Sequence, residues 1–119
     1  MKRFLAVYTG SAPAMAKWES LSEDERKERQ ATGIAAWQAW VDKNKHAIIE
    51  VGAPLGRTKS ISPAGIADIR NNLTAFTLVQ AESHEAAAKL FEGHPHFMIF
   101  PGEAVEIREC LPIPTQPQR

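Results

Sequence analysis

The chain has 119 residues, of which 44% are hydrophobic and 24% charged, with 14 Lys plus Arg against 14 Asp plus Glu. This length suits one domain with a single core, and the composition is ordinary for a soluble globular protein. The balanced charge excludes the overall positive field that attracts nucleic acid or an acidic membrane, so neither is an expected partner.

The sequence also predicts the compartment. No apolar run approaches the roughly 20 residues that a membrane span requires. The apolar start, Phe4–Val7, ends too early for the core of a signal peptide. The single cysteine, Cys110, excludes an internal disulfide and fits a reducing environment. We therefore expect a cytoplasmic protein.

The N-terminal part begins with a strand and a long helix. Phe4–Tyr8 is the expected first strand, and the segment around Pro13 is expected to form a packed loop. Ser22 with Glu25 three residues later has the pattern of a capping box, which predicts a helix running to about Asn44. The residues expected to face the core are Ile34, Trp37 and Val41, at helical spacing, with Gly33 and Trp40 beside them.

The rest of the chain alternates strands with one shorter helix. Ser83 is the expected cap of that helix and Gly93 its end. We expect one domain over residues 1–111, followed by a proline-rich tail over 112–119. The expected strands are His46–Val51, a short one at Lys59–Ile61, Leu73–Gln80 and Ala104–Glu109.

This order of elements predicts an α+β fold, a ferredoxin-like sandwich with both helices on one face of an antiparallel sheet. The first strand is apolar on both faces: Leu5 and Val7 alternate with Phe4, Ala6 and Tyr8. Since one layer of helices covers only one face, a second subunit is expected to cover the other. The sequence therefore predicts a homodimer. Glu106 and Arg108 share one face of the last strand, where we expect a cross-strand ion pair.

Two histidines one residue apart are the main candidates for chemistry. His94 and His96 titrate near neutral pH and are candidate general acids or bases. An extended segment centred on Pro95 would place both rings on the same side, where they would converge on one ligand. The alternative is structural: His94 caps a helix end and His96 packs at the sheet edge. No third ligand is apparent, so no metal site is expected.

Other candidates lie in two polar segments. Asp68 is the candidate to orient a histidine or bind a substrate hydroxyl, which would make it part of the catalytic group. Arg57 and Lys59, in the loop after Gly52, are candidate anchors for a carboxylate or phosphate. The structural alternative is that all three belong to turns with solvated side chains. The remaining candidates for ligand binding are Tyr8, Trp37, Pro54, Asn72 and His84.

A family resemblance rests on several of these segments taken together. In chain order they are the strand end at Tyr8, Gly52–Leu55, His94–Phe97 with Gly102 after it, and Val105–Glu109 before the prolines. With them the chain resembles the YCII-related proteins, the YciI-like and DGPF-domain group. The resemblance implies a ferredoxin-like subunit and a dimeric α/β barrel.

The chain departs from this family at its proposed acid–base pair. In the YciI-like branch that pair is a histidine in the first helix and an aspartate before the proline of the second motif. Here the helix position falls near Ala36 or Trp37, and His94 stands where the aspartate would be. The Asp-Gly-Pro-Phe motif is also absent, so the family's pair does not carry over.

Two hypotheses for function remain open. The first is an acid–base enzyme without a cofactor, acting on a small polar molecule in a cleft lined by the His-Pro-His segment. The second is a dimeric module that binds a small molecule, or assists another protein, without catalysis. The paired histidines favour the first, and the missing helix histidine favours the second.

Overall fold

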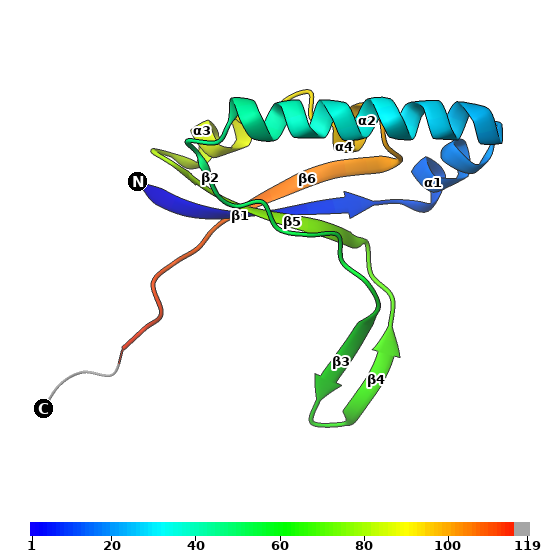
Figure 1. The fold of residues 1–119 in the computed structure, drawn as a ribbon. Helices are drawn as coiled ribbons and strands as arrows, with labels where there is room; N and C mark the ends of the chain where they lie inside the picture. The colour runs from blue at the N-terminus through cyan, green and yellow to red at the C-terminus, as the bar shows by residue number, and fades with distance from the viewer. Residues whose placement is uncertain (116–119) are drawn as a thin grey trace, which may run out of the picture.

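The computed structural model describes residues 1–115, in which helices cover one face of an antiparallel sheet (Figure 1). The strands are β1 (Lys2–Gly10), β2 (Ile48–Glu50), β3 (Thr58–Ser62), β4 (Gly65–Ile69), β5 (Leu73–Ala81) and β6 (Gly102–Glu109). The helices are α1 (Ala12–Glu19), α2 (Glu23–Lys43), α3 (His84–Lys89) and α4 (Pro95–Met98). No helix among residues 1–115 combines the length and apolar character that crossing a membrane requires.

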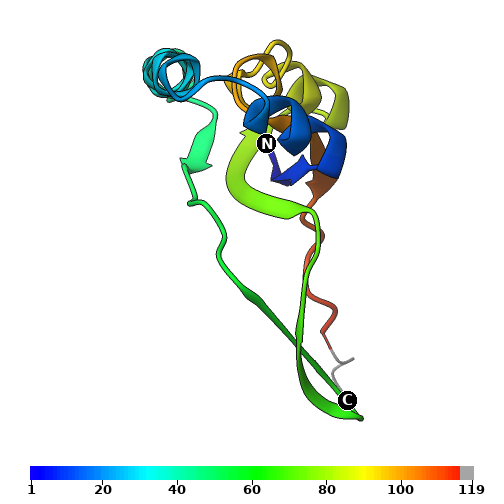
Figure 2. The ribbon, with the colours of Figure 1, turned by 90° about the vertical axis from the view of Figure 1, so that its right-hand side faces the viewer.

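The four-stranded sheet has the order β2-β5-β1-β6, and all of its strand pairs are antiparallel. The central strands β1 and β5 pair Phe4 with Val79 and Tyr8 with Ala75. This arrangement confirms the expected α+β class with an antiparallel sheet, and it is compatible with a ferredoxin-like subunit. Strands β3 and β4 form a separate two-stranded sheet, which Figures 1 and 2 show projecting away from the helices.

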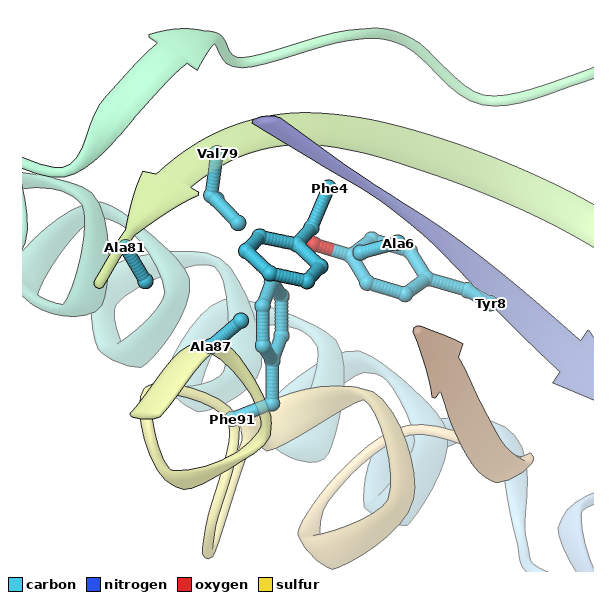
Figure 3. Packing of buried hydrophobic residues seen from close by; sticks show 7 residues of the cluster. All are labelled: Phe4, Ala6, Tyr8, Val79, Ala81, Ala87 and Phe91. Atoms are coloured by element: carbon cyan, nitrogen blue, oxygen red, sulfur yellow. The ribbon is translucent and has the colours of Figure 1, made fainter. Parts of the chain in front are cut away.

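The core lies between the sheet and α3, as Figure 3 shows. Burying these side chains removes apolar surface from water and is the main stabilising term for the layer. The indole N–H of Trp40 also donates to the carbonyl of Leu90 at 2.7 Å, which ties α2 to the end of α3. The buried cluster consists of Phe4, Ala6, Tyr8, Val79, Ala81, Ala87 and Phe91.

Helix α2 begins and ends where its capping residues predict. The hydroxyl of Ser22 accepts the N–H of Glu25 at 3.1 Å, and Asn44 is the C-cap. Its inward face differs from the expectation, because Ile34 is 50% exposed while Gly33 is buried. The ring of Phe100 occupies the space beside Gly33, where a Cβ would lie 2.5 Å from it. The glycine therefore lets an aromatic ring approach the helix. The inward face of α2 accordingly includes Gly33 and leaves Ile34 half exposed.

The segment around Pro13 is a helix and not the expected loop. The Ser11 hydroxyl accepts the N–H of Ala14 at 3.2 Å and caps α1. Pro13 lies in the first turn of that helix, where a residue without an N–H loses no intrahelical hydrogen bond. The proline therefore starts this helix and does not interrupt it.

Two further segments differ from the expectation. The His-Pro-His segment is not extended, because Pro95 opens the short helix α4 with His94 as its N-cap. The two rings therefore do not lie side by side on one face of an extended segment. Residues Gly65–Ile69, for which the sequence predicts no strand, form strand β4 against β3. Residues 112–115 have no regular secondary structure, and the remainder of the expected tail lies outside the described residues.

The sheet face opposite the helices carries an apolar strip. Leu5 and Val7 on β1 pair with Leu78 and Phe76 on β5, and all four are half-buried. No helix of residues 1–115 lies on this face in Figures 1 and 2. Within the same residues neither Glu106 nor Arg108 takes part in an ion pair, so the expected cross-strand pair is absent.

Candidate functional site

A pocket of about 460 Å³ opens between α2, the sheet and the segment that follows β2. The volume lies within the range of small-molecule sites. Helix α2 supplies one wall, residues 51–54 supply the opposite wall, and strands β1 and β5 supply the floor. The lining residues are Tyr8, Ile34, Trp37, Gln38, Val51, Gly52, Ala53, Pro54, Thr74, Ala75, Phe76, His96 and Phe100.

The lining is apolar and carries no Asp, Glu, Lys or Arg. Two of its polar side chains are already engaged within the fold. The Thr74 hydroxyl donates to the carbonyl of Tyr8 at 3.0 Å, and the Tyr8 hydroxyl lies 2.7 Å from the hydroxyl of Thr77. The polar side-chain groups left to meet a ligand are therefore the Gln38 amide, the His96 ring and the indole N–H of Trp37.

His96 lies at the base of the pocket with 6% of its surface exposed. Its Nε2 is 2.8 Å from the carbonyl oxygen of Thr9. Since a carbonyl only accepts, Nε2 carries the hydrogen, and the lone pair of the neutral ring is on Nδ1. Burial lowers the pKa of His96, and the carbonyls of Thr9 and Ala104 partly oppose this shift. The ring is therefore a neutral base at neutral pH.

His94 lies behind His96 and is fully buried. Its Nδ1 accepts the backbone N–H of His96 at 3.0 Å, which places the ring hydrogen on Nε2. Within residues 1–115, Nε2 has no hydrogen-bond partner. The rings of Trp37 and Trp40 make T-shaped contacts with His94 at 4.5 and 4.6 Å, and aromatic faces accept weakly from N–H groups.

The surroundings of His94 keep its ring neutral at neutral pH. Burial, and secondarily the charge of His96, lower the pKa of His94 to about 4. With no exposed surface, this ring cannot touch a ligand in the pocket. Its position points to a structural task, which is to fix the backbone at His96.

Tyr8 forms the floor beside both histidines. Its ring stacks on His96 with centroids 5.1 Å apart. The Thr77 hydroxyl donates its single hydrogen to the carbonyl of Val51 at 2.8 Å, so Tyr8 must donate to Thr77. Burial raises the pKa of Tyr8 to about 12, against a smaller opposite effect of the Thr77 hydrogen bond. The phenol is therefore neutral, and its proton is engaged in the hydrogen bond to Thr77.

Gly52 allows the wall opposite α2 to approach the sheet. Its φ of +81° lies in the left-handed region, and a Cβ there would meet the Phe76 carbonyl oxygen at 1.8 Å. Beyond it, Leu55 donates its N–H to the carbonyl of Thr74 at 2.8 Å. The wall is thus held against β5 by backbone contacts that only glycine permits.

The structure brings four of the candidate residues together and places a fifth beside them. Tyr8, Trp37, Pro54 and His96 line the pocket, and His94 lies directly behind. The sequence did not indicate Ile34, Gln38 and Phe100 as pocket residues, nor the Thr9 carbonyl as a partner. A buried glycine in α2 facing an aromatic residue is the signal that would have pointed to Phe100.

The other five candidates lie away from this pocket. Lys59 and Asp68 form an ion pair of 2.7 Å across β3 and β4, and Arg57 lines the same separate crevice at the base of that hairpin. The backbone carbonyl of Asn72 accepts the N–H of Gly10 before β5 begins. The ring of His84 donates to the Ile107 carbonyl at 2.7 Å and stacks on Phe4.

No group of three or more His, Cys, Asp or Glu side chains within residues 1–115 has the arrangement of a metal site. No family model matches the chain, and a search of curated proteins finds no match.

A solved structure does resemble it. This is 5-chloro-2-hydroxyhydroquinone dehydrochlorinase (TftG) from Burkholderia phenoliruptrix AC1100, in complex with 2,5-dihydroxybenzoquinone. It is 18% identical, with 89% of this chain and 90% of that chain covered, and the TM-score is 0.52. The likeness shows a shared fold. At this identity, neither activity nor site residues carry over.

Proposed function

We propose that this chain is an enzyme that removes a proton from a small molecule, with His96 as the general base and no cofactor. The observation that supports this most is the state of His96: a neutral imidazole, oriented by the Thr9 carbonyl, in a pocket without charged side chains. A base held in its neutral form near neutral pH is suited to proton abstraction.

The lining points to a neutral and mostly apolar substrate of about one ring in size. A charged ligand would lose its hydration and find no ionic partner among the lining residues. The expectation of a polar substrate anchored by Arg57 and Lys59 is thereby replaced, because both lie outside the pocket. The likeness to a structure solved with 2,5-dihydroxybenzoquinone adds support for a ring-sized ligand.

The proposed step moves one proton from a C–H or O–H group of the ligand to Nδ1 of His96. The electron pair stays on the ligand, where it either shifts to give an isomer or expels a leaving group. The new imidazolium would be stabilised by the Nε2–H donation to Thr9 and by the stacked face of Tyr8. Return of the proton to product or water completes the cycle.

A non-catalytic binding module is the second candidate. The observation that favours it is the lack of a partner acid: the Tyr8 proton is committed to Thr77, and Gln38 does not titrate. The pocket would then hold its ligand by contacts with Trp37 and Phe100.

We also propose that the chain is a cytoplasmic YCII-related protein and works as a homodimer in which the sheets pack face to face as a dimeric α/β barrel. The apolar strip at Leu5 and Val7 supports this. Val7 pairs with Glu106 and Leu5 with Arg108, so both charges lie on the same open face. A two-fold axis between them would set Glu106 of one copy against the partner's Arg108.

Exchange of the α-hydrogens of 1,4-cyclohexanedione in D₂O, followed by NMR, tests the chemistry with a neutral, ring-sized probe. We expect the protein to accelerate exchange, with a rate that rises through the lowered pKa of His96 and is constant above pH about 7. His96→Gln should remove the acceleration, and His46→Gln, at an exposed histidine, should not.

The possible outcomes separate the candidates. Equal acceleration by His96→Gln would refute the proposed base. Binding of the probe without faster hydrogen exchange would favour the non-catalytic binding module. Tighter binding of benzoate than of hydroquinone, which has the same ring without the charge, would refute the neutral substrate class.

A further inference from the structure

The β3–β4 hairpin, residues 58–69, forms an arm that leaves the body of the molecule. It projects on the side of the sheet away from the helices (Figures 1 and 2). All of its residues are exposed except Thr58 and Ser60, which are half-buried. The arm is therefore an extension that its own chain does not cover.

One face of the arm is apolar at its tip. Ile61 pairs directly with Ile66 across the two strands, so both side chains project from the same face. They are 74% and 71% exposed. The next pair with the same orientation is Lys59 with Asp68, whose ion pair lies nearer the base. Two adjacent isoleucines with a polar border resemble the centre of a protein interface and not a solvated turn.

The arm has little to stabilise it within its own chain. A two-stranded hairpin alone is at best marginally stable in water. The Lys59–Asp68 pair is exposed on both sides, and surface pairs contribute little. Packing of the exposed isoleucine pair on another surface would therefore stabilise the hairpin.

The exposed area is large enough for a stable interface. The chain exposes 9021 Å², whereas a folded monomer of 13.2 kDa exposes about 6,400 Å². The excess is about 2,600 Å², and the arm, whose residues are nearly all exposed, contributes to it. It exceeds the roughly 800 Å² per partner that a standard interface buries.

We propose that the arm packs its Ile61–Ile66 face onto a second copy of this chain. A second copy is the favoured occupant because the arm projects on the same side as the uncovered apolar strip at Leu5 and Val7. A copy that covers the strip lies alongside the arm, and the two-fold axis lets each copy receive the other's arm. This proposal extends the dimer proposed above and is independent of the chemistry at His96.

The arm also begins close to the pocket. Only Leu55, Gly56 and Arg57 separate Pro54, in the pocket wall, from the first residue of β3. Packing of the arm on a partner would therefore hold the far end of that wall in place. The proposal thus predicts tighter ligand binding by the dimer than by the monomer.

The test is sedimentation equilibrium of the full chain over a range of concentrations. The double variant Ile61→Thr, Ile66→Thr keeps β-branched residues while removing the apolar tip. It should weaken dimerisation by about tenfold or more. Ala67→Thr is the matched control, since position 67 lies on the opposite face of the same hairpin, and it should leave the dimerisation constant unchanged.

Amide hydrogen exchange of the arm provides a second measurement on the unmodified chain. Arm amides should be protected at concentrations where the dimer forms and should lose protection on dilution. A double variant that dimerises like the wild type, or arm amides that are never protected in the dimer, would overturn the role of the arm alone. A wild-type chain that is monomeric at high concentration would overturn both the arm and the sheet dimer, while leaving the chemistry at His96 untouched.

Discussion

The imidazole Nδ1 of His94 accepts the backbone N–H of His96 at 3.0 Å, so one histidine holds the backbone of the other. The ring that does so is fully buried between Trp37 and Trp40. The ring that is held lines the pocket and donates to Thr9. His94 therefore holds the backbone of His96 in position, and His96 is the residue that can contact a ligand.

A matched pair of substitutions at His94 isolates its capping role. Ser and Ala leave nearly the same cavity, but only Ser offers an oxygen at the N-cap. We expect His94→Ala to cost about 3–5 kcal/mol of unfolding free energy, the range for truncating a large buried ring. His94→Ser should cost about 1 kcal/mol less. Urea unfolding at pH 7 measures both.

His46→Ala is the control for this pair, since that histidine is exposed, and it should change the free energy by less than about 0.5 kcal/mol. Equal destabilisation by His94→Ser and His94→Ala would mean that the hydrogen bond to His96 adds nothing to stability.

The lowered histidine pKa values make stability depend on pH in a definite direction. The folded chain holds His94 neutral down to about pH 4, whereas the unfolded chain takes up that proton near pH 6.5. The free energy of unfolding is therefore not reduced by His94 above about pH 6.5, and it decreases progressively as the pH falls towards 4, because only the unfolded chain takes up the proton. At pH 5 the loss from His94 alone should be about 2 kcal/mol, and His96, also shifted downwards, adds to it.

Urea unfolding from pH 7 to pH 5 measures this loss. His94→Ser should show a shallower decrease than the wild type, and His46→Ala should show the same decrease. Stability that is constant or rises on acidification would contradict the buried neutral state of His94.

Local signals predicted much of the fold. Helix α2 starts behind the predicted Ser22 cap and ends near Asn44 as expected, and the expected strand Leu73–Gln80 lies within β5. The errors at Pro13 and Pro95 are related: the sequence predicts a loop around the first and an extended segment around the second, yet each lies in the first turn of a helix behind a capping side chain. A cap residue just before a proline is a start signal as much as a break.

The candidate site was harder to predict, because its contacts join distant parts of the chain. Tyr8 meets His96 across most of the sequence, and the tautomer of His96 depends on a backbone carbonyl. Nothing in the local sequence encodes that partner. The sequence predicts Asp68 as a partner of the histidines and Lys59 as an anchor for an anion, but the pairing of β4 with β3 places both residues in the arm.

The ionisation of Tyr8 can be observed directly, because it is the only tyrosine of the chain. Burial raises its pKa to about 12, so phenolate absorbance at 295 nm should appear near pH 12 and not near pH 10. The unfolded chain loses this proton first, so stability should decrease as the pH rises above 10. Far-UV circular dichroism at each pH separates ionisation of the folded chain from unfolding.

Thr77→Val provides the comparison for Tyr8, since it removes the oxygen that receives the phenol proton. It should cost about 1–3 kcal/mol, because the buried hydroxyl is left without an acceptor. A midpoint near pH 10 with the circular dichroism unchanged would show that Tyr8 is not buried as described.

The pocket wall can be tested with two glycines of the same loop. At Gly52 a Cβ would lie 1.8 Å from the Phe76 carbonyl oxygen, and the φ of +81° disfavours any side chain. At Gly56 nothing lies within 4 Å. We expect Gly52→Ala to displace the wall and to cost more than about 1 kcal/mol of stability, whereas Gly56→Ala should be neutral or slightly stabilising.

The same two variants separate the wall from general stability. If residues 51–54 form one side of the ligand site, Gly52→Ala should weaken binding of hydroquinone under conditions where the variant remains folded. Gly56→Ala should bind as the wild type does. Isothermal titration calorimetry gives both affinities, and circular dichroism verifies the fold. Undiminished binding by a folded Gly52→Ala protein would place the ligand elsewhere, because displacement of the wall should weaken the binding of any ligand that contacts it.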